Sequence, residues 1–269
     1  MSRAPVEPKR APREVEVSLV IAADDPESVL HRIARLREIG RYVLHARGSE
    51  RIVDRYFDTP DGALRERGWA LRLRALDGTL LLGLKGPRRG RSTKTEDRFE
   101  RERPFAPQAV EEIAARTGLK GARPDPDAAD ANDPVELLEA RLGVGVIQRR
   151  ETTRLVRDAA DAREVSGPVL AELALDQVRF QIDDREIRHF EIEVESKRPG
   201  PGTKAAKEIS AELASRYGDE LLDWSFGKLP TGQAIEDLLA RGALDDLGPE
   251  GRLRPGAYEQ IRRHLENQG

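Results

Sequence analysis

The chain's most regular feature is a series of short segments in which charged and aliphatic residues alternate. Residues 14–21 (EVEVSLVI), 68–76 (GWALRLRAL) and 187–196 (IRHFEIEVES) show the pattern most clearly. Successive side chains of a β-strand point to opposite faces, so each segment would present one charged face and one apolar face. Repeated over several segments, the alternation predicts a sheet with one apolar surface and one surface that carries both signs of charge.

Other segments extend this sheet. The Asp77-Gly78 step separates two apolar segments and predicts a tight hairpin. With the segments already named, the total is about eight strands, which favours an α+β fold with an antiparallel sheet or barrel. The additional strands are expected at residues 51–59, 79–87, 94–105, 144–157 and 167–180.

Helices are expected mostly between or after the strands. In the first of them, Asp24 or Asp25 can cap the N-terminus, Pro26 suits the first turn and Gly40 can end it. Glycines also follow two later helical segments at Gly118 and Gly218. The helices are expected at 24–40, 108–118 and 201–218, with shorter ones around 233–241 and 255–266.

The composition predicts three divisions of the chain. Residues 1–12 are expected to be a disordered leader, and 13–230 the main domain. Within that domain, residues 119–136 are rich in Pro, Asp and Ala and are interpreted as a mobile insertion loop. Residues 231–269 are expected to be a helical extension that packs on the sheet, plugs one end of it or mediates dimerisation.

The composition argues against several classes of protein, namely nucleic-acid-binding proteins, membrane-spanning proteins and proteins with disulfides or thiolate metal sites. Of the 269 residues, 46 are basic and 49 acidic, giving a net charge of −3, so no basic excess indicates nucleic-acid binding. The sequence contains no apolar run of about 18 residues that would indicate a membrane span. The absence of cysteine excludes disulfides and thiolate metal sites. The N-terminus lacks the apolar core of a signal peptide, so a cytoplasmic location is expected by default.

Six segments, in order, resemble the CYTH domain, the fold of the triphosphate tunnel metalloenzymes, from about residue 13 to residue 230. EVEVSL resembles the family's opening Glu-x-Glu-x-Lys strand, and the segment from Tyr56 to Arg74 resembles the one that leads into its first basic pair. LKGP carries the next lysine, Lys85. RFERE (98–102) resembles the Arg-x-Glu-x-Glu strand, and LAELALD (170–176) and HFEIEVE (189–195) resemble the late acidic strands.

The resemblance implies an eight-stranded antiparallel β-barrel, a tunnel with charged side chains pointing inward and helices packed outside. Relatives bind triphosphate groups together with Mg²⁺ or Mn²⁺. They hydrolyse tripolyphosphate or thiamine triphosphate, remove an RNA 5′ γ-phosphate, or cyclise ATP.

Residue chemistry agrees with this implication. Arginine offers a planar fork to phosphate oxygens, lysine supplies a point charge, and Mg²⁺ prefers carboxylates together with phosphates and water. Glu14, Glu16 and Lys85 are the candidate catalytic residues. The expected phosphate-binding residues are Arg72, Arg74, Lys85 and Arg150, with Arg98, Arg154 and Lys228 less central. The expected metal ligands are Glu14, Glu16, Glu100, Glu102, Asp176, Glu191 and Glu193. Arg98 and Arg154 have an alternative role as ion-pair partners of the carboxylates, and the four histidines show no metal spacing and are assigned no role.

One position departs from the family pattern. Residue 18 is Ser where the opening motif has lysine, and serine supplies no positive charge. Ser18 favours a protein that binds a polyanion without turnover, whereas the retained acidic pairs favour an enzyme. We expect a metal-dependent triphosphatase acting most readily on inorganic tripolyphosphate, with two alternatives. These are a class IV-type adenylyl cyclase and a non-catalytic sensor of polyphosphate or nucleotide. The expected partner is a small-molecule polyanion such as tripolyphosphate or a nucleoside or thiamine triphosphate, with no nucleic acid or membrane, and the expected assembly is a monomer or homodimer.

Overall fold

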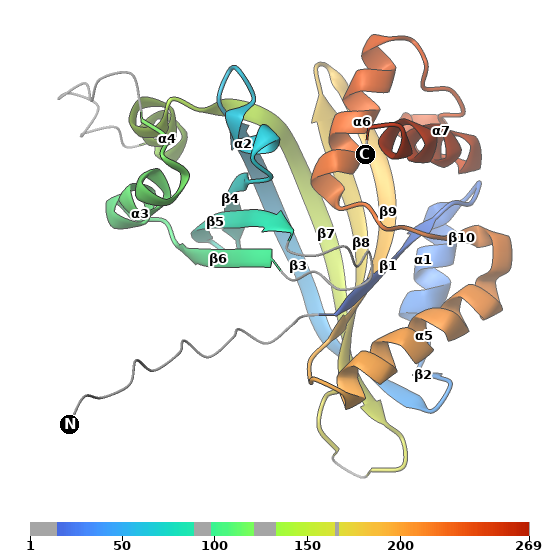
Figure 1. The fold of residues 1–269 in the computed structure, drawn as a ribbon. Coiled ribbons are helices and arrows are strands. Elements are labelled where there is room, and N and C mark those ends of the chain that lie inside the picture. The colour runs from blue at the N-terminus through green and yellow to red at the C-terminus, as the bar shows by residue number, and fades with distance from the viewer. Residues whose placement is uncertain (1–14, 89–97, 121–132, 165–166, 269) are drawn as a thin grey trace, which may run out of the picture.

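The fold is a single antiparallel sheet with helices on both faces (Figure 1). The computed structural model describes residues 15–88, 98–120, 133–164 and 167–268. The predicted leader 1–12 lies outside the described residues. Described strands are β1 (Glu16–Ile21), β2 (Glu38–Ile39), β3 (Tyr42–Asp58), β4 (Ala70–Leu76), β5 (Thr79–Arg88), β6 (Arg98–Pro104), β7 (Gly145–Asp161), β8 (Ala171–Ile182), β9 (Arg185–Ser196) and β10 (Leu221–Asp223).

The sheet contains ten strands in the order β10-β1-β9-β8-β7-β3-β4-β5-β6, with β2 paired to β3 beside this path. The predicted α+β class is confirmed, but the eight-stranded closed barrel is not. Two short strands, β2 and β10, come from segments whose periodicity predicted no strand. Over the described residues, β6 and β10 are the two ends of an open sheet.

The turn chemistry matches the expectations in most places. Asp77 and Gly78 both have positive φ, 47° and 75°, which is the conformation of a two-residue hairpin turn, and they join β4 to β5. The helices are α1 (Pro26–Ala34), α2 (Ala63–Glu66), α3 (Pro107–Thr117), α4 (Pro134–Leu142), α5 (Pro201–Tyr217), α6 (Lys228–Ala240) and α7 (Pro255–Glu266).

Two predicted segments are corrected. The helix expected at 24–40 ends at Ala34, because the chain then forms β2 before it turns into β3. Of the segment 119–136, interpreted as a mobile insertion loop, residues 121–132 lie outside the described residues, and the last three residues belong to α4. Asp133 caps this helix by accepting a hydrogen bond from Val135 N at 2.8 Å, and Pro134 occupies its first turn.

Helices α1 and α5 cover the apolar face of β1, β8 and β9. Their core joins Leu173 and Leu175 of β8 and Ile192 of β9 to Ile209 of α5. Helices α3 and α4 cover the apolar side of β4 and β5 in the same way, around Leu82. The apolar half of each alternating strand is therefore buried as predicted, which fixes which residues lie on the opposite side.

The C-terminal extension packs on that opposite side, at one end of the sheet. Val178 and Phe180 of β8 form a buried cluster with Ile235 of α6 and Tyr258 of α7. Gly232 brings α6 close to β8, because a Cβ at this position would lie 2.7 Å from the Phe180 ring. Of the three placements considered for the tail, the structure shows packing across one end of the sheet.

Candidate functional site

Strand register places the predicted site residues on one face, which we call the charged face. Residues directly opposite each other in an antiparallel pair share a face. Asp54 of β3 lies opposite Arg74 of β4 and Arg150 of β7. The charged face carries Glu16, Ser18, Asp54, Tyr56, Arg72, Arg74, Lys85, Glu100, Glu102, Arg150, Arg154, Asp176, Glu191 and Glu193.

One half of this face, on β3, β4 and β7, is basic. The carboxylate of Asp54, which is only 1% exposed, lies 2.7 and 2.9 Å from Arg74 nitrogens and 2.9 Å from Arg150 Nη2, with Arg72 Nε at 3.9 Å. Burial acts to raise the pKa of Asp54, but Arg150, Arg74 and Arg72 outweigh it and hold the pKa far below its usual range. Three guanidinium groups therefore share one carboxylate.

Two further contacts orient these arginines. Arg72 Nη2 reaches Glu102 at 2.5 Å across β5, where Gly83 lies in register between them and has no side chain to block the path. Arg150 Nη2 donates to the hydroxyl of Tyr56 at 2.9 Å. The Nη1 atom of Arg150 is buried and has no hydrogen-bond partner among the described residues.

Lys85 and Glu100 form an ion pair of 2.8 Å on the neighbouring strands β5 and β6. A small hollow opens beside them, lined in part by Tyr56, Arg72 and Gly83. The predicted phosphate-binding residues Arg72 and Lys85 therefore lie at the same hollow, with Glu100 and Glu102 as their counter-charges.

The other half of the charged face, on β1, β8 and β9, is acidic. Arg154 binds Asp176 through two hydrogen bonds of 2.7 and 2.6 Å and reaches Glu193 at 2.5 Å. Lys228, at the first position of α6, contacts Asp176 at 3.1 Å and Glu191 at 2.9 Å and also pairs with Glu193. Burial acts to lower the pKa of Lys228, but the surrounding carboxylates raise it well above its usual value.

Glu16 lacks a comparable partner in this half. Its carboxylate accepts a hydrogen bond from Ser18 Oγ at 3.1 Å. Glu16 is exposed to solvent, and repulsion by Glu193 is the main effect that raises its pKa to about 8, against the opposing effect of Lys228. Glu193 shows the reverse: burial would raise its pKa, but Lys228 and Arg154 hold it low. The acidic half therefore has more negative charge than its two cations neutralise.

A divalent cation fits this imbalance. Mg²⁺ commonly binds through one or two carboxylates and completes its coordination with substrate phosphates and water. Glu16 and Glu193 repel each other and lie on the neighbouring strands β1 and β9 of the charged face. The described residues contain no ready-made group of three or more His, Asp or Glu ligands. Asp176 and Glu191, both buried, are instead occupied by Arg154 and Lys228.

Some predicted residues cannot be placed, and some placed residues were not predicted. Glu14 and the side chain of Arg98 lie outside the described part of the chain. Asp54 and Tyr56 were missed. Their signal was present in residues 51–59, where they alternate with Val53 and Arg55 and so share one face of the strand.

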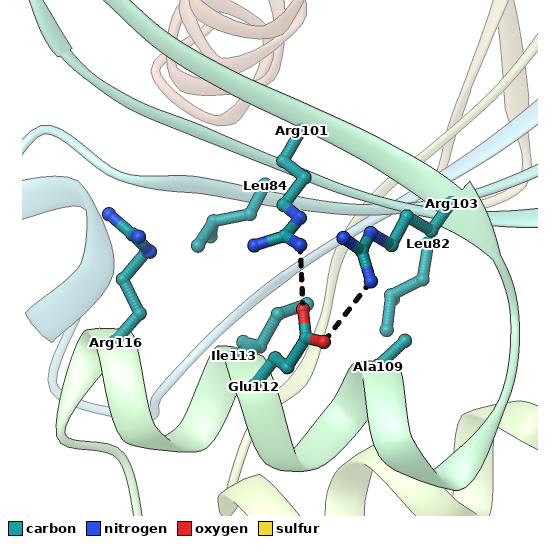
Figure 2. Close-up of a pocket in the computed structure, with 8 residues that line it drawn as sticks. All are labelled: Leu82, Leu84, Arg101, Arg103, Ala109, Glu112, Ile113 and Arg116. Carbon is teal, nitrogen blue, oxygen red and sulfur yellow. Dashed lines mark hydrogen bonds and ion pairs between the residues drawn. The ribbon is translucent and has the colours of Figure 1, made fainter. Parts of the chain in front are cut away.

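A second hollow lies on the apolar side of the sheet, between β6 and α3 (Figure 2). Arg101 and Arg103, which alternate with Glu100 and Glu102 along β6, point to this side and pair with Glu112 of α3 at 3.3 and 3.1 Å. The sheet separates this second hollow from the charged face, so the hollow takes no part in the site described above.

Comparison with known proteins agrees with this architecture. A family model of the CYTH domain matches residues 14–221. The chain therefore belongs to the CYTH family, and the resemblance seen in its strand motifs is confirmed. No curated protein matches the chain. No helix among the described residues is long and apolar enough to cross a membrane.

One solved structure shows a similar fold at low sequence identity, and two further matches are weaker. HpAC1 from Hippeastrum, described as a candidate adenylyl cyclase with a dominant triphosphatase activity, is 18% identical with a TM-score of 0.51, and the match covers 83% of this chain and 96% of that one. A candidate adenylate cyclase from Bacillus halodurans is 16% identical with a TM-score of 0.46, covering 80% and 95%. PH1819 from Pyrococcus horikoshii is 18% identical with a TM-score of 0.44, covering 85% and 99%.

Proposed function

We propose that the charged face binds a triphosphate together with Mg²⁺ or Mn²⁺ and hydrolyses it, with inorganic tripolyphosphate as the preferred substrate. The observation that carries this proposal is the separation of charge on one face of the sheet. Three arginines share Asp54 in the basic half, whereas Glu16 is repelled by Glu193 in the acidic half. A polyanion accompanied by a divalent cation is complementary to both halves at once.

In the basic half, Arg72, Arg74 and Arg150 are the phosphate-binding residues. Asp54 and Tyr56 fix their guanidinium groups before a ligand arrives. Preorganised donors stabilise developing charge without reorganising during the reaction, so this arrangement suits phosphoryl transfer. Lys85 adds a further positive charge at the same hollow.

In the acidic half, Glu16 and Glu193 are the carboxylates that would hold a divalent cation, with Glu14 as a further candidate. Such a cation supplies Lewis-acid stabilisation of phosphate oxygens and lowers the pKa of a bound water. Asp176 and Glu191, which were expected to be metal ligands, instead hold Arg154 and Lys228 in place. We assign them a positioning role.

The two alternatives rest on separate observations. Ser18 favours a sensor without turnover, because it faces Glu193 across the strand pair and brings no positive charge into the acidic half. The description of HpAC1 couples a candidate cyclase with a dominant triphosphatase activity, so both reactions on ATP belong in the test. The dominance of triphosphatase activity in that protein supports the hydrolase as the first choice for this chain.

The test is phosphate release from tripolyphosphate, ATP and thiamine triphosphate with Mg²⁺, Mn²⁺ or chelator, with cyclic AMP measured in the ATP reactions. We expect metal-dependent release that is fastest with tripolyphosphate. Arg72→Ala should raise KM and Glu16→Gln should lower kcat, whereas Arg103→Ala on the opposite side of the sheet should leave both unchanged. Tight binding of tripolyphosphate without release would establish the sensor instead, and formation of cyclic AMP the cyclase.

A further inference from the structure

His189, on β9, connects the acidic half of the charged face to the C-terminal helix α7. His189 and Tyr258 are both 0% exposed. The Nδ1 atom of His189 lies 3.1 Å from the Tyr258 hydroxyl, and its Nε2 atom lies 3.1 Å from Glu191 Oε2. The same Glu191 oxygen lies 2.9 Å from Lys228 Nζ. A continuous chain of polar contacts therefore runs from α7 to the Lys228 ammonium.

The donors and acceptors present determine the direction of each hydrogen bond in this series of contacts. The backbone N–H of Phe190 donates to the Tyr258 oxygen at 3.2 Å, so the Tyr258 hydroxyl proton is directed to His189 Nδ1. Nδ1 is then the acceptor, and Nε2–H donates to Glu191. In the opposite tautomer, Nε2 and the Glu191 carboxylate would face each other as two acceptors. An imidazolium would leave the buried Tyr258 proton without a partner, which is costly.

A second set of contacts fixes the start of α6, where Lys228 is located. The Tyr258 ring packs edge-on against Trp224, with ring centroids 5.7 Å apart. Trp224 Nε1 donates to Thr231 Oγ1 at 3.1 Å, and Thr231 Oγ1 donates to the carbonyl of Gly227 at 3.0 Å. Gly227 directly precedes Lys228, so contacts that begin at Tyr258 restrain both the ammonium and the backbone of this lysine.

We propose that Tyr258 and His189 are positioning residues that fix Lys228 among Asp176, Glu191 and Glu193. The C-terminal helices would then complete the functional site, although α7 lies beyond residue 221, where the family match ends. The catalytic consequence rests on the proposed triphosphatase function. The network itself does not, so the two claims can fail separately.

The network is tested directly by ¹⁵N NMR of the full-length protein near neutral pH. We expect His189 to show the Nε2–H tautomer alone, and the Lys228 ammonium to give a signal protected from exchange with water. In Tyr258→Phe, His189 should keep the Nε2–H tautomer, because Glu191 still accepts from Nε2, but the loss of the Tyr258 hydroxyl should loosen the ring and broaden the Lys228 signal. An Nδ1–H tautomer, a doubly protonated ring, or a Lys228 signal unchanged in Tyr258→Phe would overturn the proposal.

The consequence for the site is tested with kinetics and calorimetric binding of Mn²⁺ with tripolyphosphate. Loss of an outer hydrogen bond around a metal site typically costs about 10–100-fold in activity; because Tyr258 acts on Lys228 only through His189 and Glu191, we expect kcat of Tyr258→Phe to fall by about tenfold, the lower end of that range. KM should stay within about threefold, because the basic half is untouched. Tyr217→Phe is the matched control, since Tyr217 is half-buried beside Arg32 and far from this network.

A second pair of variants tests the positioning role even if Tyr258→Phe folds poorly. His189→Gln can still donate to Glu191 and should retain more activity and Mn²⁺ binding than His189→Leu, which cannot. Equal values for these two variants in folded protein would refute the positioning role. If the wild-type protein releases no phosphate, the proposed function fails, while the tautomer and Lys228 signals still decide the network.

Discussion

Replacement of Asp54 by Asn tests whether one buried carboxylate holds the basic half together. The substitution removes the charge but nearly preserves the shape, leaving Arg74 and Arg150, and Arg72 nearby, without their shared counter-charge. Breaking a buried ion pair from one side typically costs about 3–5 kcal/mol. At about 2–4 °C per kcal/mol for a chain of this size, Tm should fall by roughly 6–20 °C.

The assay is thermal unfolding with and without tripolyphosphate. A ligand that binds only the native state raises Tm, and the positive charge left without a counter-charge should make the variant bind the polyanion more tightly than the wild type. The ligand-induced rise in Tm should therefore be larger in Asp54→Asn. Asp223→Asn, an exposed site on β10, is the control and should change stability by less than about 0.5 kcal/mol.

Two outcomes would refute this reasoning. If Asp54→Asn melts within about 1 °C of the wild type, the carboxylate does not offset the arginines, given the usual scale of about 2–4 °C per kcal/mol. If tripolyphosphate stabilises variant and wild type equally, the arginines do not bind phosphate. These arginines hold the pKa of Asp54 far below the value of 3.8 that an unfolded chain would show. The charged carboxylate therefore stabilises the protein at pH values above 3.8, and this stabilisation is lost as the pH falls from there toward the pKa of the folded state.

Three further predictions concern the acidic half and α6. Because repulsion by Glu193 raises the pKa of Glu16 from 4.5 to about 8, the native protein in chelator retains a proton that the unfolded chain has lost, so Tm should fall as pH rises through this interval. Calorimetry should show that Mg²⁺ or Glu16→Gln removes this fall; an unchanged slope in Glu16→Gln would contradict it. Ser18→Lys should increase tripolyphosphate hydrolysis, by about a hundredfold if the missing charge limits the rate, and an unchanged rate would show that Ser18 is a tolerated variation. Gly232→Ala should destabilise the protein by about 1–3 kcal/mol in urea unfolding, because its Cβ would clash with Phe180; equal stability would mean that α6 can shift freely.

Strand alternation predicted the faces of the sheet well because it depends only on local geometry. Glu191 and Glu193 share a face with Arg154 simply because each strand has a two-residue period and its apolar half is buried under helices. The alternation could not predict which charged residues pair. Lys228 was expected to bind phosphate, yet α6 carries it into the acidic half, where three carboxylates surround it.

The missed features depend on contacts between distant parts of the chain. His189 showed no metal spacing and was assigned no role, because its partner Tyr258 lies 69 residues away on α7. Closure of the sheet was expected from family resemblance, whereas an open ten-stranded sheet is described here. Helix α4 was missed because Pro and Asp in its sequence context favoured a loop, although Asp133 and Pro134 also form a helix N-terminus.

The central claim is that the two halves of the charged face bind one ligand together, and the most direct measurement is calorimetric binding of tripolyphosphate with and without Mg²⁺. We predict that Mg²⁺ strengthens binding to the wild type but not to Glu16→Gln, and that Arg72→Ala weakens binding under both conditions. Equal strengthening by Mg²⁺ in wild type and Glu16→Gln, or binding unaffected by Arg72→Ala, would contradict the account.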